Sequence, residues 1–245
     1  MVNINQQNAV HRNKMQRLLI SIADNPFLSS RIYFKGGTCA AMLGYLDRFS
    51  VDLDFDPHKK LEQSDVLNIR KELLPIFKSL DFKIDNDENH ESLFFTLKYK
   101  AMINQRNTLM ISIFDEVVKS NEYQKTKILE IDRFVICQTV ESMFANKLVS
   151  VIDRYNRHKR IAGRDIYDVN HFFEQGYEFR EEIIEERTGQ TTKEYIEKLV
   201  AFIEKEVTEE LITRDLNMLL PFEKFNKVRK TLKQDTLLFL NSVIK

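Results

Sequence analysis

Apolar and acidic residues alternate one by one over residues 51–55, where the chain reads Val-Asp-Leu-Asp-Phe. A period of two is typical of a β-strand with one buried face, because successive side chains of a strand point to opposite sides of the sheet. We therefore expect the three apolar residues to face the core. Asp52 and Asp54 then lie side by side on the opposite face, together with Ser50.

Two carboxylates at this spacing predict a metal site. Like charges so close raise each other's pKa unless a cation lies between them. Mg²⁺ commonly takes one or two protein carboxylates and completes its shell with water and substrate phosphates. Asp52 and Asp54 are thus the expected ligands for Mg²⁺ or Mn²⁺, although an Asp-x-Asp pair alone is more often a solvated strand face.

A glycine turn lies shortly before this strand. Residues 31–34 read as a short strand, Gly36-Gly37 permits a tight turn, and Thr38 opens a helical segment. A strand, a glycine turn and a helix N-terminus in succession can cradle a phosphate. We therefore predict that Gly36, Gly37, Thr38 and Ser50 bind the phosphates of a nucleotide, since the two motifs together are far more specific than either alone.

Gly36-Gly37-Thr38, followed by residues 48–55, resembles the signature of the AbiEii/AbiGii toxin family, a branch of the nucleotidyltransferase superfamily that includes the MenT-type toxins. The resemblance implies an α/β (α+β) fold, with a mixed-sheet nucleotidyltransferase lobe followed by a helical C-terminal domain. It also implies an NTP-dependent nucleotidyltransferase that acts as the toxin of a bacterial toxin–antitoxin or abortive-infection pair. Some members add nucleotides to the 3′ end of tRNA, so a tRNA acceptor and a cognate antitoxin are expected partners.

A second segment extends the resemblance to about residue 170. Residues 141–154 have helical periodicity, and Arg164-Asp165 opens another helix. The family has an equivalent Glu…Lys…Arg-Asp-x-x-Asp pattern, which implies that Lys147 binds the triphosphate, that Asp165 is a later catalytic aspartate and that Asp168 is structural. The candidate catalytic residues are then Asp52, Asp54, Lys147 and Asp165.

One position departs from the superfamily pattern. Nucleotidyltransferases commonly carry a third carboxylate on a later strand, and the best candidate strand, residues 109–115, has Ser112 at that place. A serine cannot replace a carboxylate as a metal ligand or strong base, and Asp115 lies on the other face by parity. Either two aspartates suffice, with Asp165 taking the missing role, or the site is weakened.

The bulk properties fit two lobes in a reducing compartment. The chain has 245 residues, 43% of them hydrophobic, and we place a nucleotidyltransferase domain at 1–136 and a helical domain at 137–245. No secretory signal and no stretch near the ~20 apolar residues of a membrane span is evident, so a cytoplasmic protein without membrane contact is expected. Two isolated cysteines predict no disulfide framework.

Nucleic-acid binding must be local, because 37 basic residues balance 37 acidic ones. The densest basic cluster lies between Lys147 and Asp165, beside the expected site, and phosphate contacts of this kind position an RNA backbone. The predicted RNA-binding residues are Arg154, Arg157, Lys159, Arg160 and Arg164.

Three functions fit these patterns. The first is metal-dependent transfer of NMP from an NTP to an acceptor hydroxyl, with RNA as the acceptor. The second is a catalytically weak protein that binds nucleotide or RNA, for which Ser112 is the argument. The third is a kinase-like or hydrolytic use of the same NTP site, because a phosphate cradle does not identify the acceptor.

Overall fold

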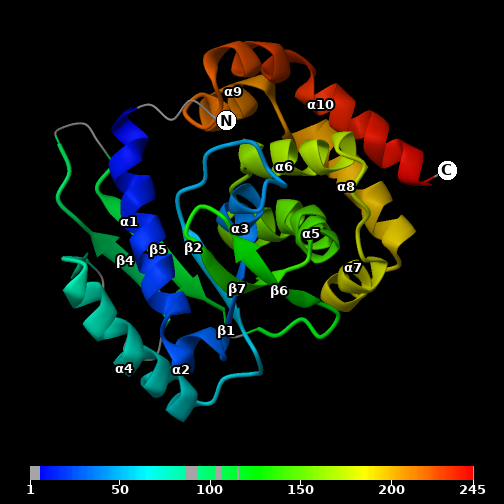
Figure 1. The fold of residues 1–245 in the computed structure, drawn as a ribbon. Coiled ribbons are helices and arrows are strands. Elements are labelled where there is room, and N and C mark those ends of the chain that lie inside the picture. Colours follow the sequence, from blue (N-terminus) through cyan, green and yellow to red (C-terminus); the bar gives the residue numbers. More distant parts are fainter. Residues whose placement is uncertain (1–5, 86–92, 103–105, 115, 245) are drawn as a thin grey trace.

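A seven-stranded mixed sheet forms the centre of the molecule, in the strand order β3-β4-β5-β2-β1-β7-β6 (Figure 1). The structure is a computed structural model, and it describes residues 6–85, 93–102, 106–114 and 116–244. The strands are β1 Ile32–Lys35, β2 Leu53–Pro57, β3 Lys83–Ile84, β4 Phe94–Lys98, β5 Thr108–Ile113, β6 Tyr123–Ile128 and β7 Arg133–Gln138. The predicted mixed α/β fold is confirmed.

The predicted alternation before and along β2 is also confirmed. Val51, Leu53 and Phe55 are 6%, 0% and 1% exposed, whereas Asp52 and Asp54 are half-buried. The apolar face of the sheet is covered by α1 (Gln6–Ala23) and α4 (Gln63–Ser79) (Figure 1), so burial of this face fixes which way the aspartates point.

The strand register brings polar residues into one row across the sheet. β1 and β2 are antiparallel and place Lys35 opposite Asp54, and β2 and β5 are parallel and place Asp54 opposite Ser112. Residues opposite each other in neighbouring strands point to the same face. Lys35, Asp54 and Ser112 therefore share the face that carries the expected site.

Helices follow the sheet in the chain. Two short ones, α2 (Pro26–Ser29) and α3 (Gly36–Met42), flank β1, and every described element after Gln138 is helical. These later helices gather on one side of the sheet in Figure 1: α5 Val140–His158, α6 Gly163–Glu174, α7 Glu181–Thr188, α8 Thr192–Glu206, α9 Glu209–Leu216 and α10 Phe222–Ile244. The predicted boundary at residue 136 falls inside β7, and the division into two domains stays a prediction. Within the described residues, no helix is long and apolar enough to cross a membrane.

The periodicity is misleading at one place. Residues 128–136 read as a single strand, but they hold the end of β6, a turn and most of β7, which pair as an antiparallel hairpin. Asp132 takes a positive φ of 50° in that turn. The turn contains neither glycine nor proline, and so the usual sequence signal for a reversal is missing.

Candidate active site

The backbone of the glycine turn lies directly against one of the two aspartates. α3 begins at Gly36, whose φ is +78°, and a Cβ there would lie 2.6 Å from Asp54 Oδ2. A Cβ on Gly37 would lie 2.9 Å from Arg48 Nη2 and 3.2 Å from Ser50 Oγ. At both positions a larger residue would collide with a neighbouring side chain, and Gly36 also has a backbone conformation that favours glycine.

Thr38 ties the turn to the strand. Its buried Oγ1 hydrogen-bonds to the carbonyl oxygen of Asp52 and lies 2.9 Å from Ser50 Oγ. A buried threonine with these partners fixes the segment that leads into β2. Ser50 is half-buried and lies beside Gly37, so it is the hydroxyl that faces the predicted phosphate cradle.

The two aspartates repel each other in a partly buried setting. Burial, with the negative charge of Asp54 as the second cause, raises the pKa of Asp52 to about 6, although Arg164 and Arg106 oppose the shift. Ser112 Oγ donates a hydrogen bond of 2.6 Å to Asp54 Oδ1. This bond orients the carboxylate and leaves Oδ2 beside Gly36.

Asp52 and Asp54 could bind a magnesium ion, but they do not form a metal site with three ligands from the protein. The described part of the chain holds no cluster of three or more His, Cys, Asp or Glu residues that could bind a metal, and Asp115 lies outside it. Mg²⁺ needs only one or two protein carboxylates when phosphates supply the remaining oxygens. Asp52 and Asp54 meet that requirement. A cation bound between them would also lower the raised pKa of Asp52.

Lys147 lies between two buried carboxylates. Its Nζ is 3.1 Å from Asp165 Oδ1 and 2.9 Å from Asp168 Oδ2. Arg154 Nε is 2.7 Å from the other oxygen of Asp165, and Arg48 binds Asp168 through two hydrogen bonds of 2.5 and 2.7 Å. Three cations thus hold two carboxylates, and the lysine is fixed in one place on α5.

Both carboxylates of this network are ionised. Burial acts to raise the pKa of Asp165, but Lys147 and Arg154 outweigh it and lower the pKa to about 2. The pKa of Asp168 is lowered in the same way by Arg48 and Lys147, against burial. The oxygens of Asp165 point at Lys147 and Arg154 rather than at Asp54, which makes this residue a partner of the lysine.

Arg48 belongs to the segment that carries the family resemblance, but the sequence does not predict its partner. It lies in the segment before β2 and binds Asp168 of α6, 120 positions away. Its guanidinium also lies against Gly37. Contacts between such distant residues depend on tertiary packing, and no local periodicity predicts them.

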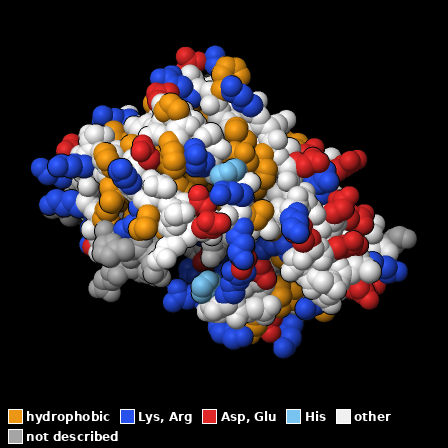
Figure 2. Space-filling view, turned by 90° about the horizontal axis from the view of Figure 1, so that it is seen from below, with side chains coloured by type: hydrophobic (Ala, Val, Ile, Leu, Met, Phe, Trp, Pro, Cys, Tyr) orange, Lys and Arg blue, Asp and Glu red, His pale blue; other side chains and the backbone are white. Residues whose placement is uncertain are grey.

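The basic cluster divides into two groups. Arg154 is bound to Asp165, and Arg164 acts electrostatically on both Asp52 and Asp165, so these two residues reach the site. Arg157, Lys159 and Arg160 are exposed at the C-terminal end of α5 and just beyond it. Figure 2 shows positive and negative side chains interspersed over the face in view, as the balanced total charge leads one to expect.

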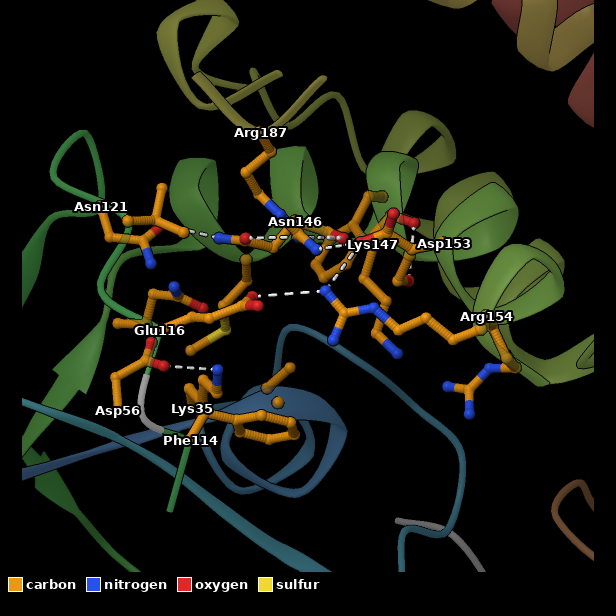
Figure 3. A pocket seen from close by; sticks show the side chains of 18 of the residues that line it. Lys35, Asp56, Phe114, Glu116, Asn121, Asn146, Lys147, Asp153, Arg154 and Arg187 are labelled. Carbon is orange, nitrogen blue, oxygen red and sulfur yellow. Dashed lines mark hydrogen bonds and ion pairs between the residues drawn. The ribbon is translucent and has the colours of Figure 1, made fainter. Parts of the chain in front are cut away.

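A cavity of about 280 Å³ opens beside Gly36, between the sheet and α5 (Figure 3). Lys35 and Asp56 line it from the sheet, and Lys147 and Arg154 line it from α5. Gly36 lines the cavity and also contacts Asp54. The cavity therefore lies next to the pair of aspartates, with Gly36 between them.

The fold is that of nucleotidyltransferases of known structure. A protein from Helicobacter pylori assigned as a nucleotidyltransferase is 22% identical, with 98% of this chain and 96% of that chain covered and a TM-score of 0.59. JHP933 from Helicobacter pylori is 22% identical, with 99% and 94% covered and a TM-score of 0.57. MenT4, a nucleotidyltransferase toxin from Mycobacterium tuberculosis, is 17% identical, with 97% and 90% covered and a TM-score of 0.46. No curated protein matches the chain.

Residues 17–234 match the model of the AbiEii nucleotidyl transferase toxins of type IV toxin–antitoxin systems, and the chain belongs to this family. The resemblance inferred from the glycine turn and the aspartate pair is thus confirmed. The protein is a nucleotidyltransferase of a toxin family, and membership implies the use of an NTP and an antitoxin partner.

Proposed function

We propose that the protein transfers NMP from an NTP to a hydroxyl of RNA, most specifically the 3′ end of tRNA, with Mg²⁺ or Mn²⁺ held by Asp52 and Asp54. The observation that carries this proposal is the contact between Gly36 and Asp54. It joins a turn with a closely approaching backbone to a carboxylate pair in which Asp52 has a raised pKa. Phosphates and a divalent cation are the ligands that such a junction favours.

A divalent cation bound to Asp52 and Asp54 would neutralise charge on the transferred phosphoryl group. The protein prepares this site through Ser112, whose hydrogen bond to Asp54 Oδ1 fixes the direction of the other oxygen. Two carboxylates are then sufficient, and Ser112 acts as an orienting group in place of a third ligand. Catalysis in such a site depends mainly on positioning and electrostatic stabilisation.

The triphosphate is bound by Gly36, Gly37 and Ser50 on one side and by Lys147 on the other. Thr38 supports the turn from below, and Asp165 and Asp168 hold Lys147 in place. The acceptor hydroxyl attacks the α-phosphorus and gives up its proton to water, the bond from that phosphorus to the bridging oxygen breaks, and pyrophosphate leaves. In this scheme Asp165 serves the reaction by positioning Lys147.

An RNA acceptor is supported by the placement of the basic cluster. Arg164 lies close enough to Asp52 to affect its pKa, and Arg157 lines the cavity beside Gly36. Lys159 and Arg160 are exposed just beyond the C-terminal end of α5. Several exposed cations near the reacting centre suit a long polyanion, which a small acceptor does not require.

One assay tests the proposal against its alternatives. The protein is incubated with Mg²⁺, total tRNA and each NTP in turn, labelled at the α-phosphate. We expect label on RNA. Free labelled nucleoside diphosphate would support the kinase-like or hydrolytic alternative. Label on the protein would show NMP transfer to a protein instead of RNA, and tight NTP binding without any product would support a binding protein.

A further inference from the structure

The cavity beside Gly36 has an apolar floor. Ala40, Met143 and Phe172 line it and are 2%, 3% and 0% exposed. The ring of Phe114 lies at its edge (Figure 3) and is 44% exposed, with Lys35 Nζ 4.3 Å from the ring centre. A hydrated phosphate gains little from such surfaces, whereas a flat heterocycle can bury its faces against them.

The polar wall of the cavity is already paired within the protein. A chain of hydrogen bonds and ion pairs runs along it from β1 to α7, part of it visible in Figure 3. On the sheet side, Lys35 binds Asp56 at 2.5 Å, and Tyr123 donates a hydrogen bond of 2.7 Å to the same carboxylate. Asn121 donates to Tyr123 at 3.3 Å and accepts a hydrogen bond of 2.7 Å from Asn146. Arg187 completes the chain with hydrogen bonds of 2.8 Å to Asn146 and 2.6 Å to Asp153. The two cations of this chain, Lys35 and Arg187, are thus each paired with a carboxylate of the protein.

Gln138 is the exception in this wall. It is the last residue of β7, it lines the cavity, and it is 2% exposed. Its Nε2 has no hydrogen-bond partner, and among the described residues that line the cavity it is the only buried side-chain atom in this condition. A buried donor without a partner costs free energy, so its retention in the wall of a cavity points to a ligand that supplies an acceptor.

We propose that this cavity binds the base of the incoming NTP, and that Gln138 Nε2 donates a hydrogen bond to an acceptor on the edge of that base. The inference rests on the proposed NTP substrate and adds the residue that selects among NTPs. A nucleobase has two apolar faces and acceptor atoms at its edge, which match the apolar floor and the buried, unpartnered donor of Gln138. Gly36 connects the cavity to Asp54, so a nucleotide can place its base here and its α-phosphate at the aspartates.

Two substitutions at this residue test the assignment. Gln138→Leu keeps the side-chain size and removes the donor, and Gln138→Glu replaces the donor by an acceptor. Affinities for the four NTPs are measured by equilibrium binding with Mg²⁺ and without acceptor RNA. We expect Gln138→Leu to bind the preferred NTP about tenfold more weakly, so that the four affinities converge, because one neutral hydrogen bond is removed. Gln138→Glu should reverse the order of preference.

The matched control is Gln124→Leu. Gln124 is exposed on the neighbouring strand β6, opposite Cys137, and therefore points to the other face of the sheet. This variant should bind all four NTPs as the wild type does. Gln138→Leu should have a melting temperature at or above that of the wild type, since it removes an unpartnered buried amide, and this result distinguishes a weakened ligand site from a damaged fold.

The outcomes distinguish this inference from the proposed function. If NTPs bind and react but the four affinities keep their ratios in both Gln138 variants, the base does not lie in this cavity. If the NTP affinities stay as in the wild type, and a transfer assay with RNA shows that the Gln138 variants change only the choice of the acceptor's terminal nucleotide, the cavity belongs to the RNA and the assignment to the NTP is wrong. If the wild type binds no NTP at all, the proposed function fails, and the base site fails with it.

Discussion

Gly36 and Asp54 lie so close that a methyl group on the glycine would be 2.6 Å from the aspartate Oδ2. This contact joins the turn before α3 to the strand that carries the carboxylate pair. The geometry of the proposed reaction therefore depends on a residue without a side chain. A substitution of Gly36 should reduce activity by more than the accompanying loss of folding stability can account for.

Gly36→Ala should abolish most NTP turnover, because the new methyl group must displace the Asp54 carboxylate. Gly44→Ala is the matched control, since Gly44 has a similar φ of +81° but no atom within 4 Å of an added Cβ. Both changes strain a left-handed backbone, at a cost on the order of 1–2 kcal/mol in the free energy of unfolding. Chemical denaturation and turnover are measured for both variants. Equal activity in the two would show that the contact with Asp54 is unimportant.

Lys147→Ala should lower turnover by about 10²–10³, as is typical for the loss of one electrostatic donor at a transition state. Lys147→Arg should also be impaired, because a guanidinium does not fit between Asp165 and Asp168 as an ammonium does. Lys193→Ala, at an exposed lysine of α8, is the control. Steady-state kinetics with saturating NTP measures the effect. Wild-type rates in Lys147→Ala would make the lysine a purely structural partner of the two aspartates.

Asp52 should lower the free energy of unfolding of the metal-free protein as the pH rises from about 4 to about 6, whereas buried His11, whose pKa burial lowers to about 4, should raise it over the same range. The pKa of Asp52 is about 6 in the folded protein, against an ordinary value of 3.8, so the folded state resists the loss of this proton. Asp52→Asn should remove this part of the pH dependence and add on the order of 2 kcal/mol at pH 8, less any solvent screening. Urea denaturation at several pH values measures the difference between the two proteins. An identical pH dependence would contradict the raised pKa.

Replacing Arg157, Lys159 and Arg160 together by Ala should weaken RNA binding much more than NTP binding. The slope of log affinity against log salt should flatten by up to about one unit for each phosphate that the protein no longer neutralises. A triple variant of exposed lysines elsewhere, Lys193, Lys227 and Lys230 to Ala, carries the same change in charge. Similar effects in the two variants would mean that only total charge matters, and that the cluster is no specific RNA site.

The sequence predicted the local parts of this molecule well. The alternation over residues 51–55 predicts a strand with one buried face because side-chain direction depends only on the period of the backbone. The glycine turn is readable for a similar reason, since few residues other than glycine tolerate a φ of +78°. The turn and the aspartates were joined into one site because they lie on consecutive elements of the chain, and the family resemblance supported that prediction.

The parts that escaped prediction depend on distant contacts. Arg48 and Asp168 meet across 120 positions, and neither has a local pattern that marks it as a partner. Gln138 ends an ordinary strand, and only its burial in the cavity without a hydrogen-bond partner distinguishes it. The hairpin of β6 and β7 was missed because its turn lacks glycine and proline.

The most direct test of the central claim is a comparison of wild type and Asp54→Asn with NTP labelled either at the α- or at the γ-phosphate. Removing one charge from a repelling pair leaves the packing intact, so the variant should fold and should be as stable as the wild type. With Mg²⁺ and tRNA, the wild type should place α-label on RNA and release γ-label as pyrophosphate. Asp54→Asn should do neither. Undiminished transfer of α-label by Asp54→Asn would contradict the two-aspartate site on which this account rests.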